Sequence, residues 1–312
     1  MEYKLNITYI TIDAYVELDK YRFVYFVIMF TAYILIICTN STIVCLIVIH
    51  KNLHEPMYIF IAALLLNSVL FTTVIYPKIL FDVLSVKQII SYSACLFQFY
   101  VCYSLGAAEF LLLAAMSYDR YVSICKPLQY PTIMTKTNIC ILLVVAWILP
   151  AGQLAVPIGL SADVELCEFS FKQIFCNSAV LKLQCEQSRV SNIYMVIALV
   201  SLLILPVLFI LLTYIRIFII TYQKVRRKAA QTCLPHLIVL INYSCLASFD
   251  VLLVLMETDF PKIVRLIMST QSILYHPLFN PIIYGLKMKE IYKHLRKLFS
   301  CICLIVNSGN IL

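Results

Sequence analysis

The sequence predicts an all-α fold: a bundle of seven transmembrane helices followed by a short amphipathic helix at the membrane surface. Of the 312 residues, 62% are hydrophobic and only 13% are charged, whereas about a quarter of the residues of a soluble domain are charged. The hydrophobic residues form seven long runs, and a helix needs about 20 such residues to cross a bilayer. Basic residues cluster at the ends of these runs, as expected beside anionic lipid.

Residues 1–22 are expected to form an extracellular N-terminal tail. They carry scattered charges and lack the apolar core and cleavage site of a signal peptide, so the first hydrophobic run should act as the insertion signal. Asn6-Ile7-Thr8 is a sequon, and we expect Asn6 to be glycosylated. Asn40-Ser41-Thr42 also matches the sequon, but it lies within the first run and should not be used.

The seven runs place the transmembrane bundle at residues 23–286. Their approximate limits are 23–49, 57–80, 93–118, 138–160, 191–222, 231–256 and 264–286. Glu109 and Asp250 interrupt the third and sixth runs, and an ionisable residue inside a membrane is a candidate for a functional site. For Asp250 the alternative is that its side chain reaches to the outer interface. Seven spans cannot form two equal inverted halves, which argues against a repeat-built transporter.

Residues 287–312 should form a cytoplasmic amphipathic helix and tail. Within 287–299, Ile291, Leu295, Leu298 and Phe299 share one face of a helix and the other face is basic, a pattern typical of a helix lying on a membrane. Cys301 and Cys303 follow and are candidates for palmitoylation. Basic residues at 224–228 and 287–297 should lie inside the cell. The N-terminus is therefore expected outside.

The third run ends in MSYDRYVSICKPLQY, residues 116–130, and the seventh ends in HPLFNPIIYGLKMKE, residues 276–290. The first string resembles the Asp-Arg-Tyr signature of rhodopsin-like G-protein-coupled receptors, in the form found in odorant receptors. The second contains the Asn-Pro-x-x-Tyr pattern of the same family. LHEPMY (53–58), PKIL (77–80) and KAAQTCLPHL (228–237) agree in order and position. The resemblance covers about residues 23–300, and LLLNSVLF with HPLFNPIIYGLKMKEI looks like fish members of the odorant receptor family.

The resemblance implies a plasma-membrane receptor that binds a small-molecule odorant within its bundle and activates a heterotrimeric G protein, raising cyclic AMP. It implies no cofactor. The residues of G-protein coupling and activation would be Asp119, Arg120, Tyr121, Tyr214, Asn280, Pro281 and Tyr284. The ligand pocket would be lined by Cys102, Tyr103, Gly106, Ala107, Ala198, Leu202, Cys245 and Phe249. For each pocket position ordinary close packing is the alternative, because small residues are common where membrane helices touch.

Four cysteines are expected on the outer side, in an oxidising compartment that favours disulfides. Spacing alone permits three pairings of four cysteines. The resemblance implies the pairs Cys95–Cys176 and Cys167–Cys185.

The sequence departs from the family pattern at two places. The acid expected in the second span falls on Ser68, with Asn67 beside it, although Glu109 is present. A sodium site at Glu109 is therefore doubtful, and the alternative is a protonated Glu109 that is hydrogen-bonded inside the bundle. The aromatic switch position of the sixth span falls on Ser244, with Tyr243 beside it.

Other classes of function fit the sequence less well. No HExxH motif, paired intramembrane Asp or Gly-rich phosphate loop indicates an enzyme. A transporter or channel would place charged residues at mid-membrane on several helices, where this chain has Glu109 and little else. No repeated CxxC pattern suggests zinc. The +8 charge lies in short clusters between apolar runs rather than on a soluble face, which argues against nucleic acid as a partner.

Overall fold

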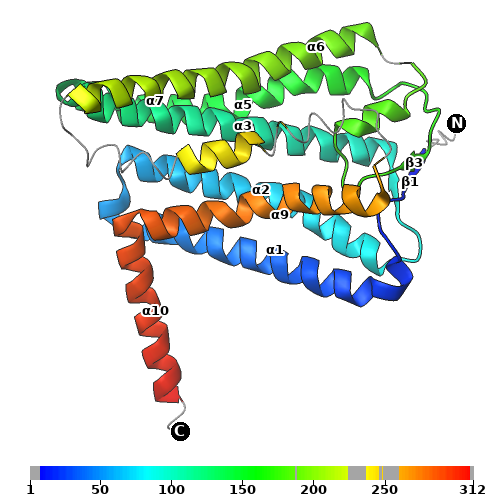
Figure 1. The fold of residues 1–312 in the computed structure, drawn as a ribbon, viewed down its shortest axis with the longest axis horizontal. Coiled ribbons are helices and arrows are strands. Elements are labelled where there is room, and N and C mark those ends of the chain that lie inside the picture. The colour runs from blue at the N-terminus through cyan, green and yellow to red at the C-terminus, as the bar shows by residue number, and fades with distance from the viewer. Residues whose placement is uncertain (1–7, 187, 224–236, 246–247, 249–259, 310–312) are drawn as a thin grey trace, which may run out of the picture.

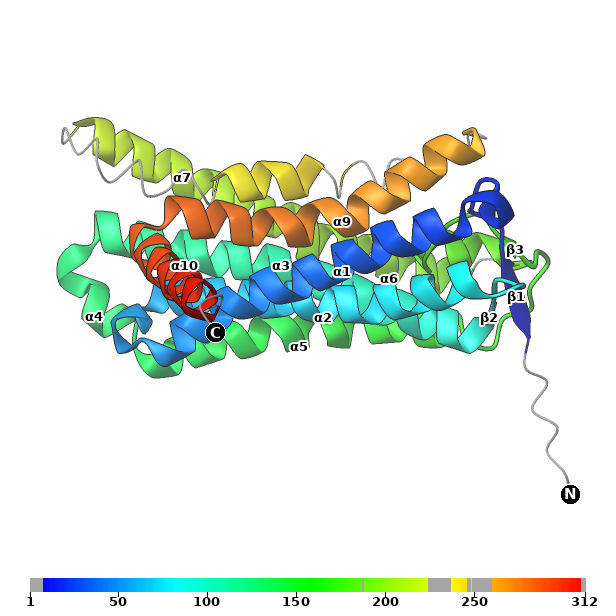
Figure 2. The same ribbon diagram turned by 90° about the horizontal axis from the view of Figure 1, so that it is seen from below.

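The computed structural model describes residues 8–186, 188–223, 237–245, 248 and 260–309, and within them the chain is a bundle of long helices (Figure 1). The helices run side by side in both views of the ribbon (Figures 1 and 2). The long helices, in chain order, are α1 (Leu18–Ile49), α2 (Pro56–Leu84), α3 (Tyr92–Cys125), α5 (Lys136–Leu160), α6 (Arg189–Leu199), α7 (Leu205–Gln223), α9 (Lys262–Lys287) and α10 (Lys289–Gly309).

Five of the described helices are long and apolar enough to cross a membrane. They are Leu18–Ile49, Pro56–Leu84, Tyr92–Cys125, Lys136–Leu160 and Arg189–Ile220. These helices confirm the first five predicted runs. The seventh run is α9, which packs against α1 and α2. Of the sixth run, 237–245 and 248 are helical, and the remainder, including Asp250, lies outside the described residues.

In α5, one face of the helix is buried in the bundle, and apolar side chains are also exposed on its outward face. Ala146, Pro150 and Leu154 are buried at four-residue intervals, which is the spacing of one helix face. Ile141 and Ile148 are 53% and 66% exposed. A helix with apolar residues on its outward face needs lipid rather than water around it.

Proline shapes the fifth span. Pro206 has no backbone N–H, and a five-residue π-helical turn, η4 (Val200–Ile204), precedes it between α6 and α7. The Leu205 N–H donates to the Val200 carbonyl, five residues back. The three elements therefore form one continuous helix with a widened turn, located in the region where ligand contacts were expected.

The predicted N-terminal tail is partly a strand. β1 (Tyr9–Ile12) pairs antiparallel with β2 (Ile89–Ser91) and parallel with β3 (Ser170–Phe171), at the end of the bundle that carries the N-terminus, called the outer end below (Figure 2). Ile10 and Ile12 point inward and are buried. An ion pair joins Asp13 to Lys262 at the start of α9. The described part of the tail thus covers the outer end.

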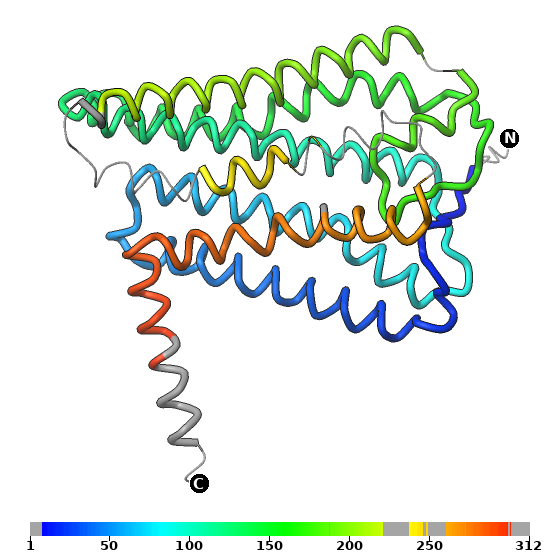
Figure 3. Tube along the Cα trace, viewed as in Figure 1, coloured from blue at the N-terminus to red at the C-terminus, as the bar shows by residue number. Residues whose placement is uncertain are grey.

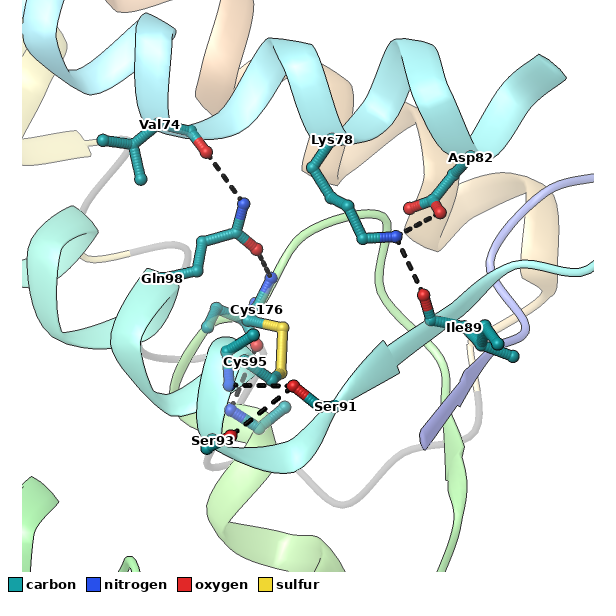
Figure 4. The surroundings of a disulfide bond; sticks show 12 residues. Val74, Lys78, Asp82, Ile89, Ser91, Ser93, Cys95, Gln98 and Cys176 are labelled. Atoms are coloured by element: carbon teal, nitrogen blue, oxygen red, sulfur yellow. Dashed lines mark hydrogen bonds and ion pairs between the residues drawn. A yellow bond between two sulfur atoms is a disulfide. The ribbon is translucent and has the colours of Figure 1, made fainter. Parts of the chain in front are cut away.

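Both predicted disulfides are present, and Figure 4 shows the first. Cys95 at the outer end of α3 is bonded to Cys176, and Cys167 is bonded to Cys185. Gln98 fixes the first bridge, because its Oε1 accepts the Cys176 N–H at 3.0 Å and its Nε2 donates to a carbonyl of α2 at 3.0 Å. The outer loop is therefore tied to the helix that carries most of the candidate site.

The opposite end of the bundle, called the inner end below, holds α10 and three short helical turns. The short helical turns are η1 (Lys51–Leu53), η2 (Pro127–Gln129) and α4 (Tyr130–Ile133) at this end, with η3 (Ser178–Leu183) in the outer loop. α10 leaves the bundle directly after α9 and projects across the direction of the long helices (Figures 1 and 3). Its course suits a helix lying on the membrane surface, and it continues to Gly309, beyond the predicted limit of 299.

Candidate coupling and ligand sites

Asp119 and Arg120 lie at the inner end of α3, where they bond to each other. Asp119 is fully buried, and its Oδ2 accepts from Arg120 Nε at 3.0 Å and from Arg120 Nη2 at 2.5 Å. The Arg120 side chain is 12% exposed. An isolated charge would be costly at this depth, so the pair compensates itself and the guanidinium is held on its own helix.

Tyr130 completes this arrangement, and the sequence reasoning did not single it out. Its hydroxyl donates to Asp119 Oδ1 at 2.8 Å from α4. Burial, and after it the hydrogen bond to Asp119, raise the pKa of Tyr130, so the phenol stays a neutral donor. Tyr130 is the last residue of the string 116–130, and that position was the signal for it in the sequence. The sequence alone does not show that Tyr130 contacts Asp119.

Tyr214 and Tyr284 lie in the same inner hydrophobic cluster. Both are buried, at 8% and 0% exposure, and the cluster also contains Met116 of α3, with Tyr121 packed against it. The three tyrosines of the expected coupling set, on α3, α7 and α9, therefore share one hydrophobic cluster. How they move on activation stays a prediction.

A polar cluster lies between this inner layer and the outer half. Glu109 Oε1 is 2.6 Å from His276 Nε2 and accepts from Asn280 Nδ2 at 3.0 Å. Asn280 Nδ2 also lies 3.5 Å from Ser68 Oγ. All four residues are buried. Asn280 was expected to be functional, whereas His276, one helical turn before it, was missed.

Tyr243 changes the expectation for Gly106. The Tyr243 hydroxyl donates to the Gly106 carbonyl at 2.6 Å, and a Cβ on Gly106 would stand 3.2 Å from that hydroxyl. The space that glycine leaves on α3 is filled by the sixth helix rather than left open for a ligand. The Tyr243 ring also packs against His276, with 4.3 Å between ring centroids.

The remaining pocket candidates are distributed unevenly. Cys102, Ala198 and Leu202 are buried in the outer hydrophobic cluster, against which Tyr103 and Ala107 pack. The Tyr103 hydroxyl donates to Ser178 Oγ of the outer loop at 2.9 Å. The structure thus brings α3, α6 and η4 together around a mainly apolar surface. Separately, Cys245 is exposed, and Phe249, like Asn6 in the tail, lies outside the described residues.

Comparison with known proteins agrees with this architecture. The olfactory receptor family model matches residues 29–301. The chain is 32% identical to human olfactory receptor 11A1 over 302 residues, covering 94% of each chain. It is 37% identical to human olfactory receptor 10K1 over 282 residues, covering 87% of this chain and 88% of the relative. The likeness to fish members stays a prediction. The family is a receptor family without enzymatic activity, and this chain belongs to the olfactory receptor family.

Proposed function

We propose that this odorant receptor binds a small, mainly apolar molecule in the outer half of its bundle and activates a heterotrimeric G protein at the inner end, raising cyclic AMP. The ligand region is supported by the apolar cluster around Cys102, Ala198 and Leu202, beneath the disulfide-linked outer loop. Cys102 stands where amine receptors of the superfamily carry an Asp, so an amine salt bridge is not expected there.

The observation that carries the coupling proposal is the restraint on Arg120. Its guanidinium is bonded to Asp119, which Tyr130 also holds. This arrangement fits the inactive state. A ligand that binds the active arrangement more tightly shifts the population toward it. Arg120 is then released and packs against the G protein, with Tyr214 and Tyr284 closing around it, and a helix of the G protein enters the opened inner cleft.

We further propose a plasma-membrane location with the N-terminus outside and 287–312 in the cytoplasm. The apolar outward faces of the helices require a lipid bilayer. Basic residues at 287–297 would meet the anionic inner leaflet as α10 lies along it.

The test is a panel of small-molecule odorants on cells that report cyclic AMP and carry either the natural chain or Arg120→Ala. Surface expression and ligand binding should survive the substitution, because Arg120 lies 18 residues from Cys102 of the ligand region, or roughly 27 Å of helix rise. The odorant-dependent signal should disappear. Lys136→Ala is the matched control, since it removes an exposed cation at the start of α5, at the same end of the bundle, and should leave the signal unchanged.

One outcome would overturn the coupling proposal. If Arg120→Ala reaches the surface and still raises cyclic AMP with unchanged amplitude, Arg120 does not couple the receptor to its G protein. Patch recording on the same cells would then detect direct ion conduction as the other output.

A further inference from the structure

We infer that Glu109 holds no sodium ion in this receptor, and that His276 of the chain itself takes the place of the cation. Glu109 and His276 then form an internal latch between α3 and α9. The latch lies between the ligand region and the coupling layer, and it makes the inactive bundle independent of sodium.

The contact requires a proton. His276 Nε2 and Glu109 Oε1 are 2.6 Å apart, and the side chains are only 6% and 4% exposed. Two lone pairs at this separation would repel each other strongly. A hydrogen atom must therefore lie between the two atoms. The chain itself thus occupies the position beside Glu109 Oε1 that an ion would otherwise take.

The second neighbour of the carboxylate is also a donor. The Asn280 amide nitrogen lies 3.0 Å from Glu109 Oε1. The opposite orientation of the amide would set its oxygen against the carboxylate oxygen, so the amide is fixed as a donor. A sodium ion is bound through oxygen atoms. Here two nitrogen groups already approach the oxygen that an ion would need.

The position that could have supplied a second carboxylate is neutral. Ser68 is buried, and its hydroxyl donates to the Leu64 carbonyl of its own helix at 3.2 Å. A sodium ion here would have a single carboxylate, and the Oε1 atom of that carboxylate already has His276 Nε2 and Asn280 Nδ2 against it. The donor set around Glu109 therefore does not fit sodium.

The latch is also connected to the sixth helix. Tyr243 packs its ring on His276 and bonds its hydroxyl to the Gly106 carbonyl of α3. Any movement of the sixth helix away from α3 must loosen the packing on His276. The pair therefore stabilises the arrangement in which α3, the sixth helix and α9 are in contact.

The experiment uses the purified full chain in detergent micelles, with NaCl replacing KCl at constant ionic strength. The thermal midpoint of the natural receptor should not change with sodium. In His276→Ala the Glu109 carboxylate keeps Asn280 but loses the imidazole beside Oε1, and sodium should raise the midpoint. A ligand of the native state at about ten times its dissociation constant raises the folded-to-unfolded ratio roughly tenfold.

Two controls define the result. His54→Ala, which removes an exposed imidazole near the inner end, should remain insensitive to sodium. The double variant Glu109→Gln with His276→Ala should lose the sodium effect that His276→Ala gained. These measurements use neither an odorant nor a G protein. A result that contradicts the inference about sodium therefore leaves the proposed receptor function untouched.

The inference is overturned if sodium stabilises the natural receptor and Glu109→Gln removes that effect. This comparison decides the matter even if His276→Ala does not fold. A well-folded His276→Ala receptor that stays insensitive to sodium would equally show that His276 does not occupy the place of the ion.

Discussion

Asn40 should stabilise the receptor through a bond that a proline makes necessary. Pro281 has no N–H, so the Pro277 carbonyl, four residues earlier in α9, lacks its helical partner. Asn40 of α1 is fully buried and donates its Nδ2 to that carbonyl at 2.9 Å, as well as to Ile36 of its own helix at 2.8 Å. The side chain therefore replaces the missing backbone donor and joins α1 to α9.

Asn40→Ala should lower the thermal midpoint of the purified receptor. Leaving a buried carbonyl without a partner costs about 1–3 kcal/mol, whereas side-chain hydrogen bonds between membrane helices average about 0.6 and reach about 1.7 kcal/mol. We take about 1–1.5 kcal/mol, which at about 2–4 °C per kcal/mol gives a fall of roughly 2–6 °C. Thr39→Ala is the control, because the Thr39 hydroxyl bonds only to carbonyls of its own helix.

Pro281→Ala tests whether the missing N–H of Pro281 is the reason that Asn40 stabilises the receptor. Alanine restores an N–H at position 281, which can donate to the Pro277 carbonyl in the regular helical pattern. In that background Asn40→Ala should cost much less than in the natural chain, and the difference is the coupling energy of the pair. If Asn40→Ala lowers the midpoint equally in both backgrounds, the bond to Pro277 contributes nothing and the reasoning is refuted.

Three further outcomes follow from the outer and inner ends. Tyr130→Phe removes one hydrogen-bond donor from Asp119, and a bond to a charged group is worth about 1.5 kcal/mol. The ratio of active to inactive receptor should therefore rise roughly tenfold without ligand, which is measured as raised basal cyclic AMP. An unchanged basal level contradicts this. Cys95→Ala should abolish surface labelling, because a native disulfide typically contributes about 2–5 kcal/mol, and normal labelling would disprove it. Glycosidase should increase the gel mobility of the natural chain but not of Asn6→Gln, and an externally accessible C-terminal tag would refute the orientation.

The helices could be predicted because their signal is local. Long apolar runs located α1, α2, α3, α5 and the fifth span to within a few residues at most ends. α3 runs to Cys125, past the predicted limit of 118, because Asp119 and Arg120 compensate each other and allow the helix to continue through two charges. An apolar count stops at two adjacent charges, whereas the backbone does not.

The outer sheet and the polar cluster could not be predicted in the same way. β1 pairs with segments about 80 and 160 residues away, and nothing in its four residues identifies those partners. Glu109 and His276 are far apart in sequence, and their contact depends on the relative register of α3 and α9. The sequence therefore revealed an acid inside the membrane but not the imidazole that contacts it.

One face of α3 connects the three layers. Glu109 comes seven residues after Cys102, and residues seven apart on an α-helix differ by only about 20° around its axis. Arg120 comes 18 residues after Cys102, which is about five full turns. The ligand candidate Cys102, the latch residue Glu109 and the coupling residue Arg120 therefore lie on one stripe. A rotation of α3 would move all three in the same sense, so we expect ligand binding, loosening of the latch and release of Arg120 to occur together.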